Sequence, residues 1–209
     1  MPGLSRVPFV PVSTGFVPTD IAGCRLWLDG ADSGAVIMDG GYVDVWNDKS
    51  VNLFAFSPSA VQYEAPYLVF NGTSSYLQRT SSTIIDTNWS IFVVSKFTDT
   101  AYMPLMDFGI DGIRRIAVEN GNLSVGATVD RAYPPGLVNT GKPFIAEYFR
   151  TSSSGQIVGA ITGGSFATTI GPTGQVLNMD ITTIGASSLN DSFFNGYICL
   201  LYTSDAADE

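Results

Sequence analysis

Residues 24–29 of the chain read C-R-L-W-L-D, a pattern typical of a β-strand with one buried face. Cys24, Leu26 and Leu28 occupy every second position, and the charged Arg25 lies between two of them. Side chains alternate between the two faces of a strand, so the three apolar residues share one face. This stretch therefore predicts a strand that packs on a core through one face.

The same kind of pattern recurs along the whole chain, as short apolar or alternating runs broken by Gly, Asn, Asp, Ser and Pro. Asn120-Gly121 lies between two such runs and favours a tight type I′ hairpin turn. Residues 91–94 are all apolar, which predicts a central strand covered on both faces. The predicted strands are 24–29, 42–47, 53–57, 67–71, 75–78, 90–97, 103–108, 114–119, 123–129, 144–150, 156–162, 181–186 and 193–203.

This number of strands predicts the fold class. It exceeds what an immunoglobulin-type sandwich holds, and no long stretch has helical spacing with caps. We therefore predict one all-β domain over residues 20–198, a two-sheet antiparallel jelly-roll β-sandwich. Residues 1–19 contain four prolines and predict an extended arm or linker, either joined to a larger chain or packed on a neighbouring subunit.

Composition excludes several classes of partner. The chain has 19 acidic residues, ten Lys and Arg, no His, and a formal net charge of −9. Phosphate binding needs clustered cations, so we predict no nucleic-acid partner. No apolar run is long enough for a membrane helix, and the N-terminus shows no signal-peptide pattern. We expect no membrane insertion.

The last eleven residues, 199–209, carry a separate expectation. They can be back-translated into a DNA string that resembles the transposon-end adapter used to prepare sequencing libraries. We therefore expect a metagenomic reading frame whose last strand is completed by a non-native tail. The alternative is an ordinary last strand, 197–203, with an acidic end. If Cys199 is native, it can lie near Cys24, because first and last strands are often neighbours in sandwiches.

Four segments taken together resemble the concanavalin A-like and laminin G-like jelly rolls of phage, giant-virus and bacterial surface proteins. They are residues 20–32, 46–50, 68–77 and 194–198, and their order covers nearly the whole chain. Two departures are the Val51-Asn52 pair, where the family usually has Gly, and Asn71, where Asp is frequent.

The motif residues have structural interpretations. We expect Trp27 and Trp46 to close the sandwich edges with each indole N–H bonded to a backbone carbonyl. Asp48 is expected to accept N–H bonds within its own turn, and Asp29 to do the same after the first strand. The remaining motif residues to which we assign structural roles are Phe70, Gly72, Tyr76 and Gly196.

The sequence does not predict an enzyme. Glycoside hydrolysis needs two carboxylates across the scissile bond. Glu64, Glu119 and Glu147 lie outside the paired-carboxylate patterns of catalytic relatives of this fold. Without His, a Ser-His-Asp or Cys-His device is excluded.

Two kinds of ligand site are candidates. Laminin G-like relatives often hold one Ca²⁺ at the sandwich rim. The candidate carboxylates in this chain are Asp107, Asp111 and Asp130, with Asp180 and Asp191 behind them. For a sugar, an aromatic ring beside loop Asp and Asn side chains is the useful equipment. The predicted ligand-binding residues are Tyr133, Tyr102, Asp111, Asp130 and Asn190, with Tyr133 on the rigid Pro134-Pro135 loop.

The resemblance implies a non-catalytic carbohydrate-binding or adhesion module of a virion or cell-surface protein. The alternative is a purely structural capsid, tail or surface decoration domain. The first predicts a glycan on a sheet face or at the loop rim. The second predicts contacts with a neighbouring structural protein and a specific oligomer. Either role suggests a virion-surface or extracellular location.

Overall fold

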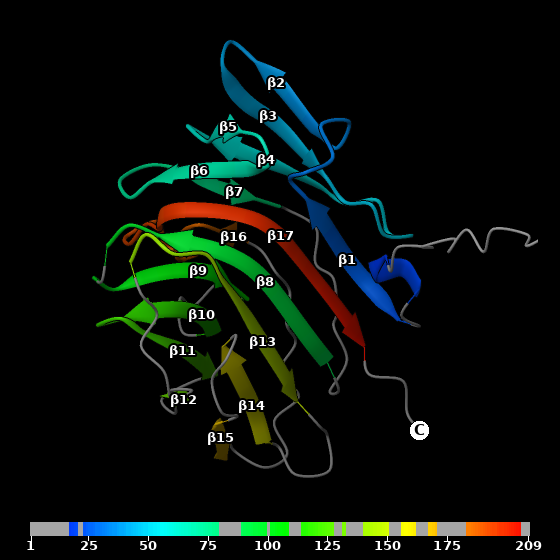
Figure 1. Cartoon of the computed structure of the whole chain (residues 1–209). Helices are drawn as coiled ribbons and strands as arrows, with labels where there is room; N and C mark the ends of the chain where they lie inside the picture. The colour runs from blue at the N-terminus through cyan, green and yellow to red at the C-terminus, as the bar shows by residue number, and fades with distance from the viewer. Residues whose placement is uncertain are drawn as a thin grey trace, which may run out of the picture.

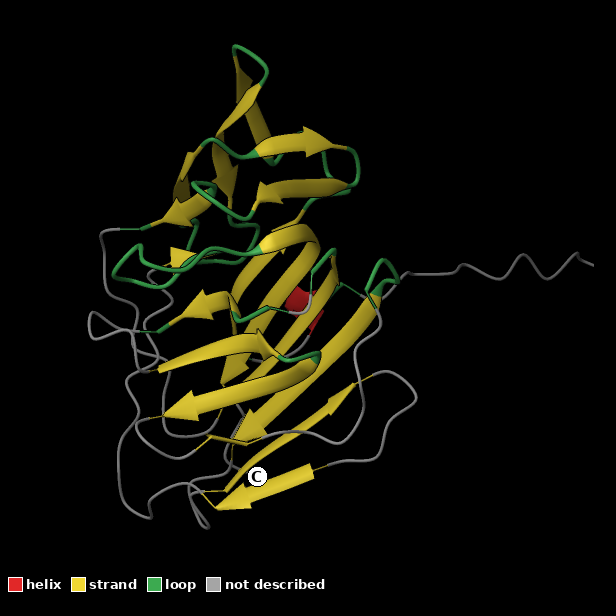
Figure 2. Ribbon diagram, turned by 90° about the vertical axis from the view of Figure 1, so that its left-hand side faces the viewer, coloured by secondary structure: helices red, strands yellow, loops and turns green. Residues whose placement is uncertain are grey.

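The computed structural model describes residues 17–20, 23–79, 89–99, 101–108, 114–127, 131–132, 140–150, 156–161, 167–170 and 183–205. Over these residues the chain is strand and loop, with one short 3-10 turn, η1 (Pro18–Asp20), drawn in red in Figure 2. The end of the predicted arm thus forms a turn rather than an extended segment. The strands are Cys24–Asp29 (β1), Val36–Asp39 (β2), Tyr42–Asn47 (β3), Ala55–Ser59 (β4), Gln62–Glu64 (β5), Tyr67–Asn71 (β6), Tyr76–Gln78 (β7), Trp89–Phe97 (β8), Met103–Asp107 (β9), Arg114–Glu119 (β10), Asn122–Ala127 (β11), Arg131–Ala132 (β12), Phe144–Arg150 (β13), Gln156–Ile161 (β14), Ala167–Ile170 (β15), Thr183–Ile184 (β16) and Asn195–Asp205 (β17).

The strands form two antiparallel sheets. Among the described residues, one sheet has the order β15-β14-β13-β8-β17-β6-β5, with β1 also paired to β17. The other has the order β12-β11-β10-β9-β16-β7-β4-β3-β2. β17, red in Figure 1, lies beside β8 in the middle of the first sheet. This is the two-sheet antiparallel sandwich that the sequence predicts.

The core consists of the inward faces of both sheets. In β8, every second side chain from Trp89 to Phe97 is buried, which is the period expected of a strand with one core face. The opposite sheet contributes large apolar side chains such as Phe56 and Leu77, both fully buried. Burying each side chain of this size contributes about 1.5–3 kcal/mol.

Most predicted strands are confirmed to within two or three residues at either end, apart from 181–186, of which Thr183–Ile184 forms β16. The Asn120-Gly121 turn is confirmed, because both residues have positive φ, 51° and 75°, and the flanking Glu119 and Asn122 pair directly. β4 begins at Ala55 rather than at the predicted Leu53. Four strands were not predicted: β2, β5, β12 and β15.

The expectation that 91–94 is covered on both faces is wrong on the outer face. Ile91 and Val93 are fully buried, whereas Phe92 and Val94 are half-buried. The outer face is shielded by neighbouring side chains: the Phe92 ring stacks on that of Tyr202 with centroids 4.6 Å apart. β8 is central within its sheet, and its second face is covered in part.

Residues 199–205 form the second half of β17, and residues 200–204 pair with both β1 and β8. Leu201 is fully buried there. The expected proximity of the two cysteines is wrong. Cys24 is opposite Ser204, whereas the Cys199 carbonyl accepts the N–H of Gly30 at the other end of β1, and both thiols are free.

Candidate functional site

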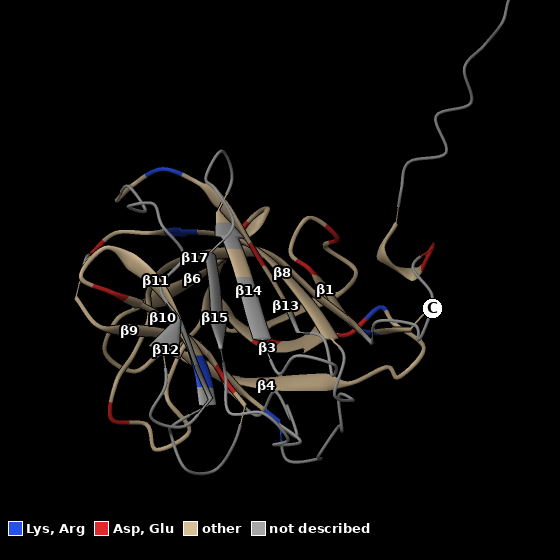
Figure 3. Cartoon of the chain, turned by 90° about the horizontal axis from the view of Figure 1, so that it is seen from below, with Lys and Arg blue, Asp and Glu red and all other residues tan. Residues whose placement is uncertain are grey.

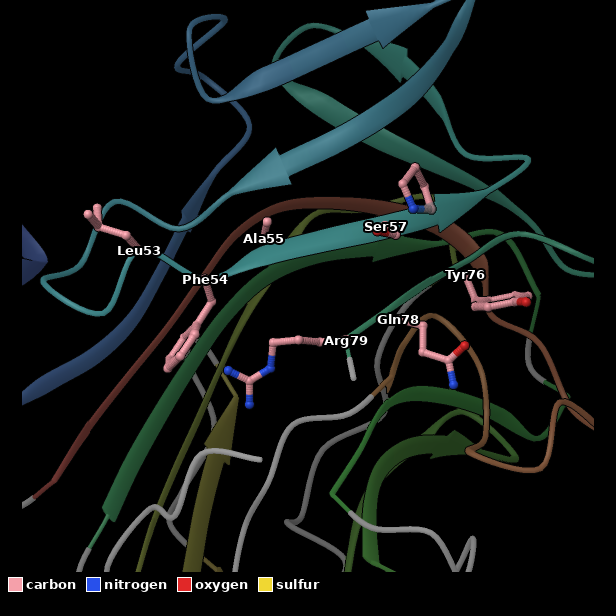
Figure 4. A pocket seen from close by; sticks show the side chains of 8 residues that line it. Leu53, Phe54, Ala55, Ser57, Tyr76, Gln78 and Arg79 are labelled. Atoms are coloured by element: carbon pink, nitrogen blue, oxygen red, sulfur yellow. The ribbon is translucent and has the colours of Figure 1, made fainter. Parts of the chain in front are cut away.

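A pocket of about 510 Å³ lies over β4 and β7. Its volume is within the range of about 300–1,000 Å³ typical of small-molecule sites. The strands bury Phe56 and Leu77 in the core, so the alternate residues point outward into the pocket. Ser57 and Gln78 are directly opposite each other in the β4–β7 ladder. Figure 4 shows the lining side chains, which are Leu53, Phe54, Ala55, Ser57, Pro58, Tyr76, Gln78 and Arg79.

Arg79 is the one cation among the described residues of this pocket. It is buried and directly follows the last residue of β7. Its guanidinium carbon is 4.0 Å from the centroid of the Phe54 ring and 5.7 Å from that of Phe56. In Figure 4 the side chain reaches from the end of β7 toward Phe54. A guanidinium over an aromatic face is attracted by the ring quadrupole, so the two rings hold its position.

The position of Phe54 depends on the carboxylate of Asp48. Asp48 is buried, and its Oδ2 accepts the N–H of Phe54 at 3.2 Å. The Asp48 N–H in turn donates to the Phe54 carbonyl at 2.8 Å. Between them Leu53 has a positive φ of 52° and is exposed at the pocket edge. The predicted turn role of Asp48 is confirmed, and the same turn supports the pocket wall.

Lys49 anchors the other side of this turn. Its ammonium is 3.2 Å from Asp29 Oδ2, 2.7 Å from Asp32 Oδ2, and 4.1 Å from the centroid of the Trp27 ring. Partial burial alone would lower the pKa of Lys49, but its bonds to Asp32 and Asp29 raise it. The Lys49 bond also lowers the pKa of Asp32. The predicted turn role of Asp29 is confirmed, since Oδ1 accepts the N–H of Ala31 at 2.9 Å.

The Lys and Arg positions, blue in Figure 3, and the Asp and Glu positions, red, are spread along several strands and loops of the described chain. No carboxylate belongs to the eight described residues that line the pocket. The described part of the lining thus combines one cation with apolar and neutral polar groups, in a chain of net charge −9.

The predicted ligand residues lie elsewhere. Tyr102 is half-buried, with the Arg115 guanidinium 4.9 Å from its ring centroid. Asn190 is exposed at a positive φ of 54°. The Ser187 hydroxyl donates to Asp191 and lowers the pKa of that carboxyl, with a smaller contribution from Arg115. Arg115 is therefore near both Tyr102 and the loop of Asn190. The other three predicted residues, Tyr133, Asp111 and Asp130, lie outside the described residues.

The predicted calcium site is tested in part. Asp107 is fully buried at the end of β9, and its Oδ2 accepts the N–H of Ser188 at 2.9 Å. Within the described part of the chain, no three His, Cys, Asp or Glu side chains are grouped to hold a metal ion. The other two proposed ligands fall outside that part, and a calcium site there stays a prediction.

The expected hydrogen bonds of two tryptophans are wrong. Among the described residues, neither the Trp27 nor the Trp46 indole N–H has a partner. Trp46 is fully buried in the core rather than at an edge, because it is on the inward face of β3. Trp27 is half-buried on the outer face of β1, beneath Lys49.

The remaining motif residues divide into two groups. Phe70 is buried and packs edge-to-face on Phe194, Gly72 has a positive φ of 75°, and a Cβ on Gly196 would be 2.3 Å from the Lys96 carbonyl. These are structural roles, as predicted. Tyr76 differs, because it is half-buried and lines the pocket.

No family model and no curated protein matches the chain. Solved structures do. Domain 4 of AbnA, an extracellular GH43 arabinanase from Geobacillus stearothermophilus solved with arabinotriose, has a TM-score of 0.63 at 13% identity, over 88% of this chain and 92% of that one. The LG4-5 domains of the mouse laminin alpha1 chain have a TM-score of 0.50 at 15% identity, over 65% of this chain and 40% of that one. The fold is a jelly-roll sandwich.

Trypanosoma rangeli sialidase, in complex with the inhibitor DANA, is a third structure of this kind. Its TM-score is 0.64 at 12% identity, over 93% of this chain and 33% of the sialidase chain. The jelly-roll domain thus spans about a third of that enzyme's length. At these identities the similarity establishes the fold, and the function has to be argued from this chain's own residues.

Sequence reasoning missed Phe54, Gln78 and Arg79 as site residues. A signal was present: Arg79 is one of only ten cations and directly follows an alternating strand. Its significance depends on Phe54, which lies 25 positions earlier and is brought over it by the β4–β7 pairing. That pairing is non-local, and the spacing along the chain does not reveal it.

One further structural finding is that none of the described helices is long and apolar enough to cross a membrane.

Proposed function

We propose that this domain is a non-catalytic carbohydrate-binding module whose ligand site is the β4–β7 pocket. The observation that carries the proposal is the convergence of Tyr76, Ser57 and Gln78 on the outward face of two paired strands. An aromatic ring packs against the apolar face of a sugar, while hydroxyl and amide groups bond its hydroxyls. These groups sit on strands, which position them firmly.

Binding rather than catalysis is favoured by the chemistry of the lining. A glycosidase needs a pair of carboxylates beside the scissile bond, and the eight lining residues that the structure describes include none. The AbnA domain of similar fold was solved with arabinotriose, and it has nearly the length of this chain. Both points support a module that holds a glycan.

We propose that the module belongs to a virion or cell-surface protein. This proposal rests on the resemblance of four sequence segments to concanavalin A-like and laminin G-like jelly rolls of surface proteins. A loop-rim site built on Tyr133, Asp111 and Asp130 is the competing location for the same function. The β4–β7 pocket is preferred because its aromatic and polar groups lie on one face of two paired strands.

The test is glycan-array binding of the full chain and two tyrosine variants. Tyr76→Ala removes the proposed sugar platform, so binding should fall by about tenfold or more. The matched control is Tyr42→Ala, because Tyr42 is exposed on β3 and outside the pocket. Binding that persists in Tyr76→Ala and disappears in Tyr133→Ala would place the site at the rim. A folded protein silent across the array would refute carbohydrate binding.

A structural module that contacts a neighbouring protein is a second candidate. The β2–β3 hairpin projects from the sandwich in Figures 1 and 2, and Ile37, Met38 and Tyr42 on it are each at least 40% exposed. Exposed apolar side chains close together on an edge hairpin favour a protein contact. Sedimentation of the wild type and of Ile37→Lys checks this: a discrete oligomer that the variant loses supports it, and a wild-type monomer counts against self-association.

A further inference from the structure

We infer that the outer face of β8 and β13 is an interface between two copies of this chain, related by a two-fold axis. The inference goes beyond the proposed function and does not rest on it, because the β4–β7 pocket belongs to the opposite sheet. It follows from three observations: the apolar side chains on this face, their exposure, and the placement of a Lys and a Glu on either side of them.

The outer face of β8 and β13 is more apolar than a solvated sheet face. On β8, Phe92 and Val94 point outward, in alternation with the fully buried Ile91 and Val93. Ile145 on β13 is directly opposite Val94. Outward positions are normally polar where one face of an antiparallel sheet is in water. Both strands lie inside the sheet (Figure 1), so apolar residues on both of their faces indicate a layer on each side.

These apolar side chains are accessible in a single copy. Ile145 is 46% exposed, and Phe92 and Val94 each keep part of their surface in contact with solvent. The half-buried Tyr197 of β17 extends the face beyond Lys96, its opposite residue in the ladder. All of these residues precede position 199, so they belong to the protein whatever the origin of its last eleven residues. Accessible apolar and aromatic side chains gathered on one face are typical of protein interfaces.

The Lys and the Glu of this face lie on opposite sides of its apolar centre. Lys96 is two residues beyond Val94 along β8, and Glu147 is two residues beyond Ile145 along β13. The two strands are antiparallel, so these steps run in opposite directions from the Val94–Ile145 pair. The two Cα atoms are therefore about 14 Å apart, too far for an ion pair within one copy. Lys96 lies over the Tyr197 ring instead, with its ammonium 4.5 Å from the centroid.

A second copy fits this arrangement of charges. A two-fold axis in the plane of the face, through the Val94–Ile145 pair, brings Lys96 opposite Glu147 of the partner subunit. The same contact then forms again across the axis, because a two-fold interface repeats every contact. The strands of the two copies are nearly aligned, as is usual for stacked sheets. The face thus complements itself, in a chain whose net charge of −9 otherwise opposes self-association.

Sedimentation velocity of the full chain over a concentration series tests the interface. We expect the unmodified protein to show a monomer–dimer equilibrium. Ile145→Lys places a charge at the centre of the interface, so it should weaken the dimer about tenfold or more. Ile37→Lys is the matched control, because Ile37 is 47% exposed and lies on β2 of the opposite sheet. The control variant should dimerise like the unmodified protein.

Exchange of the two charges tests the two-fold arrangement. Lys96→Glu places two Glu side chains opposite each other, and Glu147→Lys places two Lys side chains opposite each other. Each single variant should therefore weaken the dimer about tenfold or more. The double variant Lys96→Glu/Glu147→Lys exchanges the charges and should recover the dimer. An equal mixture of the two single variants should form a heterodimer more readily than either variant dimerises alone.

The outcomes that overturn the inference are distinct. An unmodified protein that is monomeric at every concentration would refute self-association. A dimer that is lost in Ile37→Lys and retained in Ile145→Lys would place the interface on the β2–β3 hairpin. Single charge variants that dimerise as well as the unmodified protein, or a double variant that fails to recover, would refute the two-fold arrangement. Circular dichroism checks that each variant folds, and if Ile145→Lys does not, the charge variants decide.

Discussion

The backbone N–H of Trp27 donates to Oδ1 of Asp48, 21 residues later in the chain, at 2.8 Å. This bond ties β1 of one sheet to the turn that begins β4 of the other. The same carboxylate accepts the N–H groups of Ser50 and Phe54 and the Ser50 hydroxyl, with distances from 2.7 to 3.2 Å. One buried side chain therefore organises the turn that supports the pocket wall.

Asp48→Ala should lower the free energy of unfolding by about 2–4 kcal/mol, because it leaves several buried N–H groups without an acceptor. Urea denaturation followed by tryptophan fluorescence measures this. Asp44→Ala is the control, since Asp44 is exposed on β3, and it should change stability by about 0.5 kcal/mol or less. Equal effects of the two variants would contradict the role assigned to Asp48.

The Lys49 ion pairs predict a dependence of stability on pH. Asp32 has a pKa below its ordinary 3.8, so its contribution is present above pH 3.8 and is lost as pH falls through the lower folded value. Lys49 has a pKa above 10.5, so its contribution is complete below pH 10.5 and is lost as pH rises through the higher folded value.

Lys49→Met keeps an apolar chain over Trp27 and removes the charge. We expect the variant to unfold at a lower urea concentration than the wild type at pH 7. This difference in midpoint should narrow in acid, as the pH falls below 3.8 and through the lowered pKa of folded Asp32. Lys142→Met, on an exposed loop residue, should show little effect. A gap between wild type and Lys49→Met that is the same at pH 7 and in strong acid would rule out this electrostatic account.

Substituting two glycines by Ala distinguishes the stability cost of backbone strain from the cost of side-chain crowding. Gly72 and Gly41 both have positive φ, 75° and 90°. A Cβ on Gly72 would lie 2.8 Å from the Cβ of Asn195, whereas one on Gly41 would meet nothing within 4 Å. Gly41→Ala should therefore cost about 1 kcal/mol from the backbone alone. Gly72→Ala should cost about 1–3 kcal/mol more through overpacking. Equal losses in thermal or urea unfolding would show that Asn195 moves aside freely.

The fold was predictable because most strands have one buried face and therefore alternate. β1 and β8 show this directly, with every second residue buried. All four strands that were missed, β2, β5, β12 and β15, are the outermost strands of the two sheets. They have two to four residues each. An edge strand that short shows too few alternations to be recognised, and its outward face need not be polar.

The candidate site was less predictable for a different reason. Motif spacing identified the Asp48 turn and Tyr76, but both were given structural roles only. The pocket exists because β4 pairs with β7 and brings Phe54 over Arg79. Such a pairing between distant segments depends on the whole sheet order, which local periodicity does not determine. The predicted rim residues were chosen from loop composition, and the described ones, Tyr102 and Asn190, do not line this pocket.

Residues 199–205 have a structural role whatever their origin, and truncation tests it. β17 pairs with β1 through residues 200–204, and β1 has no other strand partner among the described residues. A chain that ends at Ile198 loses this pairing and the fully buried Leu201. A Leu side chain removed from a core costs about 2–5 kcal/mol, and the unpaired β1 backbone adds to this.

We therefore expect the chain truncated after Ile198 to be insoluble or to lack a cooperative unfolding transition by circular dichroism. A chain truncated after Asp205, which keeps all of β17, is the control and should unfold cooperatively. The substitution Leu201→Ala gives an intermediate case, with lower stability and the transition retained. If the chain ending at Ile198 unfolds as cooperatively as the control, β1 does not need its β17 partner, and the sandwich closes without this half of the strand.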